Sequence, residues 1–235
     1  MKVQVQLLKQ AKRIFALLLK SWFIYLLITG LIIGVGKYMY NIPVGTFTRE
    51  PNTTLNGTFY VGAFSNLGII LWTITATLCI FSATYLKRYD PDSRFRLFML
   101  HAGILTTILL LDDTYMWHED MFPGYLGIKQ YIIYAIYFVY TLYFLINFRK
   151  VIFKTEFIIL LASLSLMSLS VLLDVLEDSE KFSAFLLKQT GIKVAKDSEI
   201  ETLLEDTFKG MGILTWLIYF ARVTIVNVLP PVKNR

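Results

Sequence analysis

The chain has 235 residues, of which 56% are hydrophobic, 15% aromatic and 17% charged. Soluble domains carry about 25% charged residues, and the apolar excess of this chain collects in blocks long enough to cross a bilayer. These properties exclude a soluble globular enzyme, a disordered chain and a nucleic-acid-binding module, and the single cysteine excludes a disulfide scaffold.

Six apolar blocks follow one another along the chain, and each predicts a transmembrane helix. A bilayer core of roughly 30 Å is crossed by about 20 helical residues, and a helix satisfies its own backbone in lipid. The blocks cover residues 14–35, 61–86, 97–115, 131–148, 157–173 and 208–229. The predicted fold class is therefore all-α, a polytopic six-transmembrane-helix bundle that forms a single integral membrane domain over residues 1–235.

The basic residues predict the direction in which the chain crosses the membrane. There are 23 Lys and Arg against 17 Asp and Glu, a net charge of +6. With six spans, most of the basic residues fall on the side of the amino terminus, in clusters at 2–20, 87–96, 149–154 and 222–235. Because cytoplasmic loops are enriched in Lys and Arg, both termini are predicted to be cytoplasmic, in a cell or inner membrane.

Two long external loops are expected, over residues 37–60 and 175–205. The first contains two formal acceptor triplets for N-glycosylation, which begin at Asn52 and Asn56, and only a eukaryotic secretory route would use them. In the second loop, Ser198 and Glu201 have the spacing of a capping box. The sixth helix is therefore predicted to begin in water, before it enters the membrane.

Two polar features lie inside the spans. The fourth span is rich in tyrosine at three-residue steps, which wrap around a helix of 3.6 residues per turn, so packing and the membrane interface are expected to explain most of them. His101 lies about 16 Å deeper than Asp112 by helix rise. We expect a neutral histidine bonded to a backbone or serine group, and a step on a proton path is the alternative.

Acidic side chains gather at the external ends of the third, fifth and sixth spans. The similar tetrapeptides LDDT, LEDS and LEDT begin there at positions 111, 176 and 204. An ionisable group costs roughly 2.5–3.5 kcal/mol at mid-bilayer and less near the interface, so the protein is expected to provide partners for these groups. We expect the three helices to meet around a carboxylate-rich pocket, with Ser65 and Asn66 of the second span in its wall.

Helical phase indicates which of these side chains share a face. Asp174, Glu177 and Asp178 are spaced i, i+3 and i+4, so they lie on one side of the fifth span. Counting backwards, Ser170 and Ser163 continue the same side. This pattern predicts a polar seam that faces other protein and not lipid.

The other two acidic helix ends are less regular. Glu205 and Lys209 are one turn apart on the sixth span and are expected to form an ion pair. Asp113 and His118 are five residues apart, about 140° out of phase on a continuous helix. His118 therefore joins the pocket only if the third helix ends or kinks near Met116.

The leading functional hypothesis is a divalent-metal-dependent membrane hydrolase that acts on a lipid or another membrane-proximal substrate. Oxygen-rich sites with one imidazole suit divalent Zn, Fe, Mn, Mg or Ca, and bound Zn²⁺ or Fe²⁺ can activate water. The expected metal ligands are Asp112, Asp113, His118, Asp174, Glu177, Asp178 and Glu205. The expected catalytic residues are Glu119, Asp206 and Lys209. The lipid bilayer is the expected partner, and no binding of nucleic acid is expected.

Two alternatives stay open. The acidic cluster is also typical of a cation- or proton-linked transporter, in which crowding of like charges raises carboxylate pKa values. It also fits a non-catalytic membrane protein whose acids lie at the interface and face water. A pocket that opens sideways to lipid would favour the enzyme, whereas a continuous polar path to the cytoplasm, or a helix broken at mid-membrane, would favour the transporter.

Overall fold

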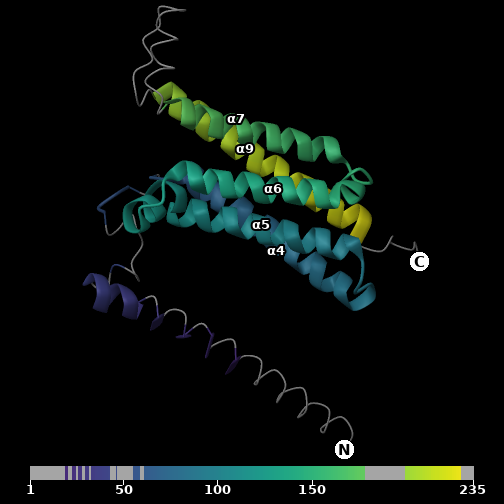
Figure 1. Ribbon diagram of the computed structural model, residues 1–235, viewed down its shortest axis with the longest axis horizontal. Helices are drawn as coiled ribbons and strands as arrows, with labels where there is room; N and C mark the ends of the chain where they lie inside the picture. Colours follow the sequence, from purple (N-terminus) through teal and green to yellow (C-terminus); the bar gives the residue numbers. More distant parts are fainter. Residues whose placement is uncertain are drawn as a thin grey trace, which may run out of the picture. The chain divides into compact units, whose positions relative to one another are not determined.

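The computed structural model describes residues 61–177 and 199–228 continuously, together with short stretches between residues 19 and 58. The chain divides into two compact units, Met1–Val61 and Gly62–Arg235. The elements described in the second unit are all helical (Figure 1). They are the α-helices α4 (Ala63–Tyr89), α5 (Arg94–Tyr115), α6 (Gln130–Ile152), α7 (Phe157–Glu177) and α9 (Glu199–Val223), and the π-helical segments η1 (Trp117–Tyr125) and η2 (Thr224–Val228).

Five of the described helices are long and apolar enough to cross a membrane. They are α4, α5, α6, the Phe157–Asp174 part of α7, and the stretch Leu204–Val228 of α9 and η2. They coincide with the predicted second to sixth spans, so the all-helical class and these five candidate spans are confirmed for the described residues. The predicted first span, 14–35, lies largely outside the described residues. A count of six spans, and the side on which the termini lie, stay predictions.

Local sequence signals set several of the helix ends. The Ser93 Oγ accepts a hydrogen bond of 3.2 Å from the backbone N–H of Phe95 and so caps the start of α5. Basic residues lie in the last turns of α4 and α6, where the helix dipole favours positive charge. The predicted early start of the last helix is confirmed, because α9 begins at Glu199.

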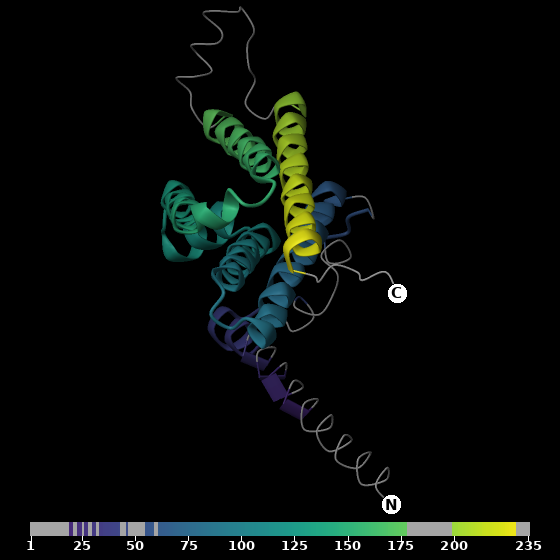
Figure 2. The ribbon, with the colours of Figure 1, turned by 90° about the vertical axis from the view of Figure 1, so that its right-hand side faces the viewer.

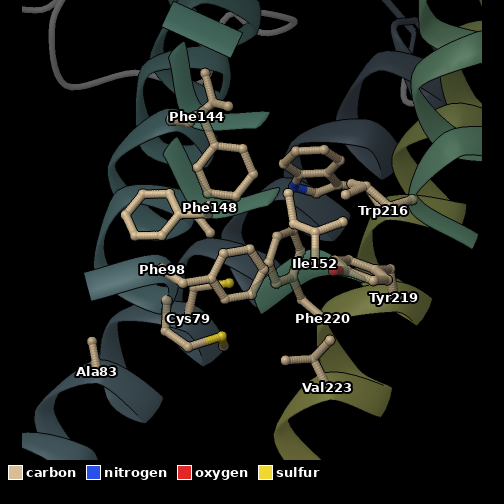
Figure 3. Close-up of a cluster of buried hydrophobic side chains, with 14 of the residues drawn as sticks. Cys79, Ala83, Phe98, Phe144, Phe148, Ile152, Trp216, Tyr219, Phe220 and Val223 are labelled. Carbon is tan, nitrogen blue, oxygen red and sulfur yellow. The ribbon is translucent and has the colours of Figure 1, made fainter. Parts of the chain in front are cut away.

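An aromatic core joins α4, α5, α6 and α9 (Figure 3). Phe98 of α5 stacks on Phe144 of α6 with ring centroids 5.3 Å apart, and its ring also contacts Phe220 of α9 at 5.9 Å. Trp72 of α4 meets Trp216 of α9 edge to face at 6.4 Å. Such pairs add to the free energy gained by burying the rings, so this core fixes the positions of the four helices.

Helices α7 and α9 run side by side in close contact (Figure 2). A Cβ atom added at Gly212 would lie 2.6 Å from Met167 Cγ and 3.1 Å from the Met167 backbone nitrogen, so only glycine permits this approach. Ser163 Oγ donates to the Gly212 carbonyl at 2.8 Å, and both Ser163 and Ser170 are buried. The predicted polar seam on this face of α7 is therefore confirmed.

Candidate functional site

The carboxyl end of α5 changes direction at Met116. This residue has a left-handed backbone conformation, with φ 48° and ψ 49°, which few residues other than glycine adopt. The α-helix ends there and η1 begins. The turn brings His118 back toward α5, where its side chain is buried. The structure thus meets the condition under which His118 was expected to join the pocket.

The buried carboxylate of Asp112 holds this turn in place. Its Oδ1 accepts from the backbone N–H of His118 at 3.0 Å and from the Tyr137 hydroxyl at 2.8 Å. Its Oδ2 accepts from His118 Nδ1 at 2.6 Å. Asp112 is 4% exposed, so these bonds supply the partners that a buried carboxylate requires. One side chain therefore ties α5 to η1 and α6.

His118 lies between two carboxylates. Its Nδ1 bonds to Asp112 and its Nε2 lies 3.2 Å from Glu119 Oε1. Burial lowers the pKa of His118, but the hydrogen bonds to Asp112 and Glu119 outweigh burial and raise the pKa to about 9. The hydrogen bond to His118 lowers the pKa of Glu119, against the opposing effect of burial. Both groups are therefore charged at neutral pH.

Asp113 connects α5 to two other helices. Its Oδ2 accepts from the indole Nε1 of Trp72 in α4 at 2.8 Å, and its Oδ1 lies 2.8 Å from Lys209 Nζ in α9. The side chain of Asp113 is 11% exposed and that of Lys209 is 37% exposed. Glu205, the partner expected for Lys209, lies close enough to add to the negative field around its ammonium group.

The tyrosines of α6 face different polar partners, as their wrapping around the helix predicts. Tyr134 OH donates to Asp174 Oδ2 at 2.6 Å, and the Tyr134 ring lies 4.9 Å from the His118 ring. One turn beyond Tyr137, the Tyr140 hydroxyl lies 3.2 Å from His101 Nδ1. His101 is thus hydrogen-bonded as expected, although its partner is a tyrosine hydroxyl and not a backbone or serine group.

A cavity of about 420 Å³ opens among the amino-terminal turns of α4, the middle of α9, the end of α5, and η1. Its charged lining consists of Asp112, Asp113, His118, Glu119, Asp206 and Lys209. Its apolar lining consists of Phe64, Leu67, Leu71, Met116, Met211, Ile213 and Leu214. Ser65 also lines the cavity, as expected, whereas its neighbour Asn66 is not part of the lining. All three expected catalytic residues line this cavity.

The expected metal ligands are brought together only in part. Asp112, Asp113 and His118 meet at the cavity, whereas Asp174 bonds to Tyr134 and to Gln130 of α6 and is not part of the lining. Asp178 and the side chain of Glu177 lie outside the described residues.

Within the described stretches, no three His, Cys, Asp or Glu side chains are placed to hold a metal ion. Both ring nitrogens of His118 face carboxylates, and Asp113 is paired with Lys209. A metal centre therefore stays a prediction: among the described residues its expected ligands are engaged with other side chains, and Asp178 and the Glu177 side chain are not described.

The sequence did not predict that three hydrogen-bond donors belong to this site: Trp72, Tyr134 and Tyr137. Each belongs to an apolar span, where the aromatic ring alone justifies its presence. The indole nitrogen and the phenol oxygens could have indicated their roles, because a buried indole N–H or phenol O–H needs a hydrogen-bond acceptor. Buried donors inside the spans and acids at their ends are complementary, but the sequence does not say which donor meets which acid.

Comparison with known proteins identifies a family. A family model described as "Domain of unknown function (DUF8692)" matches residues 23–223. No curated protein and no solved structure matches the chain. Function has to be argued from the cavity itself.

Proposed function

This chain belongs to the DUF8692 family, a domain of unknown function, and we propose that it binds the polar head of a membrane amphiphile in the cavity between α4, α5, η1 and α9. The observation that carries this proposal is the polarity of the cavity wall. Six charged side chains line it together with seven large apolar ones. An amphiphile likewise combines a polar and an apolar part.

The polarity of the wall changes along the axis of α9. On α9 the lining passes from Asp206 and Lys209 to Met211 and Leu214, a distance of about 12 Å by helix rise. On α4 the lining contains one polar side chain, Ser65, between the apolar Phe64 and Leu67. Half of a bilayer core is roughly 15 Å deep. A molecule in this cavity therefore has its head near the interface and its chain toward the bilayer centre, as the lipids of one leaflet do.

The rim of the cavity suits entry from the bilayer. Phe64 is 74% exposed, Leu67 52% and Met211 50%, and they belong to helices that are candidate membrane spans. Large apolar side chains exposed on such helices face lipid. An acyl chain can therefore lie against them without leaving the hydrocarbon, which supports a membrane-derived ligand over a soluble one.

A carrier is less well supported by the described residues. α4, α5 and α6 are continuous α-helices throughout their candidate spans. Beyond the cavity, the aromatic core fills the space between the helices. Its residues Phe98, Trp216 and Phe220 are almost completely buried. Helices α4, α5 and α6 lack the break that would favour transport, whereas the last candidate span passes from α9 into the π-helical segment η2 at Thr224.

Hydrolysis of the bound amphiphile is the second candidate. It is favoured by one observation, that the expected catalytic residues Glu119, Asp206 and Lys209 line the same cavity. In this reaction the exposed carboxylate of Glu119, oriented by its contact with His118 Nε2 at 3.2 Å, would be the general base for a water molecule. Release of a cleaved head group from a bound amphiphile, lost in the Glu119→Gln variant, would support this activity. Binding without turnover would leave binding alone as the function.

The experiment that tests binding uses Gly210, which lines the cavity and faces open space, since a Cβ atom there would meet nothing within 4 Å. Gly210→Trp should fill the cavity, and Gly210→Ala should leave it open. With purified protein in nanodiscs of zwitterionic lipid, we expect Gly210→Trp to weaken binding of a fluorescent single-chain amphiphile at least tenfold. Ile218→Trp, on an exposed position of the same helix, controls for the added indole. Equal binding by all variants would overturn the proposal.

A further inference from the structure

We infer that the head group bound in this cavity is positively charged, so that the ligand class is an ammonium-bearing amphiphile. This inference rests on the proposed function and adds the charge of the ligand to it. It follows from the charge of the cavity wall, from the pairing of its basic groups, and from the exposure of its remaining acids.

The cavity wall carries more negative than positive charge. Its acidic groups are Asp112, Asp113, Glu119 and Asp206, and its basic groups are His118 and Lys209. Counting His118 as an imidazolium still leaves an excess of carboxylates. Charges act strongly on one another at the edge of a membrane protein, where the surroundings are less polar than bulk water. A cationic head therefore balances the cavity, whereas an anionic head adds to the imbalance.

The groups that would bind an anion are already engaged. His118 contacts carboxylates through both ring nitrogens, and Lys209 Nζ lies 2.8 Å from Asp113. A phosphate or carboxylate head would have to displace these internal partners, one of which is the buried Asp112. Displacing a partner leaves a buried charge unpaired, which is strongly unfavourable. The basic residues of the lining are thus already paired with the protein's own acids.

Acidic groups, by contrast, are presented to the cavity. Asp206 is exposed and lines the wall, and Glu119, although it contacts His118, also lines the wall with its side chain 57% exposed. The Ser65 hydroxyl on the opposite helix is also exposed and can accept a hydrogen bond. The Phe64 ring at the rim provides a face toward which an ammonium group is attracted. These groups match the needs of an ammonium head that carries an apolar chain.

The experiment compares amphiphiles that share one alkyl chain and differ only in the head: a primary ammonium, a trimethylammonium, a neutral alcohol and a phosphate. Each competes with the fluorescent amphiphile for protein in nanodiscs of an uncharged glycolipid, whose head carries no ammonium group. The difference between wild type and Gly210→Trp removes simple partitioning into the bilayer. We expect the ammonium amphiphiles to compete at least tenfold more strongly than the phosphate, with the alcohol between them.

The variants locate the effect in the cavity. Asp206→Asn should weaken ammonium binding three- to tenfold and leave binding of the alcohol within twofold. Asp120→Asn removes the same charge from η1 at an exposed position that is not part of the lining, so it serves as the matched control. Thermal unfolding of each variant checks that it folds.

The outcomes separate the two proposals. If all heads compete equally and Gly210→Trp abolishes the competition, an amphiphile binds in the cavity but the inference of a cationic head is wrong. If the phosphate competes best, the inference is also wrong, and Lys209 and His118 exchange their internal partners for the ligand. If no amphiphile competes and Gly210→Trp changes nothing, the proposed function fails and this inference fails with it.

Discussion

Nδ1 of His118 lies 2.6 Å from Oδ2 of Asp112, across the turn at which α5 gives way to η1. The same carboxylate accepts the backbone N–H of His118 and the hydroxyl of Tyr137. The acid at this helix end thus holds the fold together at the point where the chain reverses. It also places Glu119, the neighbour of His118, at the cavity, so the structural and the functional roles of this cluster are linked.

The His118 imidazole should titrate far above the usual range for histidine. Its hydrogen bonds to Asp112 and Glu119 raise its pKa to about 9, against the effect of burial. NMR titration of histidine-labelled protein in micelles measures this directly, because the chain has only two histidines and His101→Gln assigns the signals. Asp112→Asn should lower the midpoint by at least one pH unit. A wild-type midpoint at or below about 6.5, the ordinary value, would contradict the geometry.

Stability should depend on pH through the same group. Because the pKa of His118 is raised in the folded protein to about 9, the imidazolium stabilises the fold fully below about pH 6.5, and this contribution is lost as the pH rises through about 9. Its upper limit is about 3 kcal/mol. The Tm of the wild type should fall across this window and that of His118→Gln should fall less. Parallel curves would show that His118 does not couple stability to pH.

Breaking the Asp113–Lys209 pair should destabilise the bundle. Asp113→Asn or Lys209→Met alone is expected to cost about 1–3 kcal/mol, between the values for exposed and buried pairs, because Lys209 is partly exposed. The double variant should cost less than the sum, and equilibrium unfolding in mixed micelles measures the coupling. Glu156→Gln, which breaks the exposed pair with Arg222, is the control and should have a much smaller effect. Strict additivity would contradict the pairing.

Alanine should have opposite effects at two glycines of α9. At Gly212 the new Cβ would lie 2.6 Å from Met167 Cγ and 3.1 Å from the Met167 backbone nitrogen, so α7 and α9 must move apart, at a cost of about 1–3 kcal/mol. At Gly210 nothing lies within 4 Å, and alanine should stabilise the helix by roughly 0.5–1 kcal/mol. Unfolding measurements on both variants check this. Equal effects would mean that α7 and α9 are not in close contact.

Thr106→Val should be costly although it keeps the shape of the side chain. Trp216 Nε1 donates to Thr106 Oγ1 at 3.0 Å, and both side chains are buried. Valine leaves the indole N–H without an acceptor, which costs about 1–3 kcal/mol. Thr107→Val is the matched control, because Thr107 Oγ1 bonds only to the Gly103 carbonyl of its own helix. Similar stability of the two variants in equilibrium unfolding would argue against the prediction.

Much of the fold followed from the sequence. The apolar blocks predicted the second to sixth spans, because a helix of about twenty apolar residues matches the thickness of the bilayer core. The seam of Ser163 and Ser170 followed from helical phase, since the period of a helix fixes which residues share a side. The convergence of α5 and α9 acids on one cavity followed from their common position at helix ends.

Other features did not follow, and for identifiable reasons. Helical phase shows which residues share one side of a helix. It does not show which neighbouring helix that side faces. Asp174, expected with the other acids, faces α6 and accepts from Tyr134. Lys209 pairs with Asp113 from another helix. The left-handed turn at Met116 was also not predicted. Methionine does not favour this conformation, and the hydrogen bond from the His118 backbone N–H to Asp112 holds the turn in place.

The sequence alone determined that charge gathers at the ends of long apolar helices, because local composition and spacing carry that information. Only the tertiary structure decided which acidic side chains are paired and which are exposed. Donors from distant segments, such as Trp72 at a separation of 41 residues from Asp113, form hydrogen bonds with particular acids, while other acids stay exposed to the cavity. The packing of the aromatic core sets which donor reaches which acid, and packing is a property of several helices together that no single stretch of sequence contains.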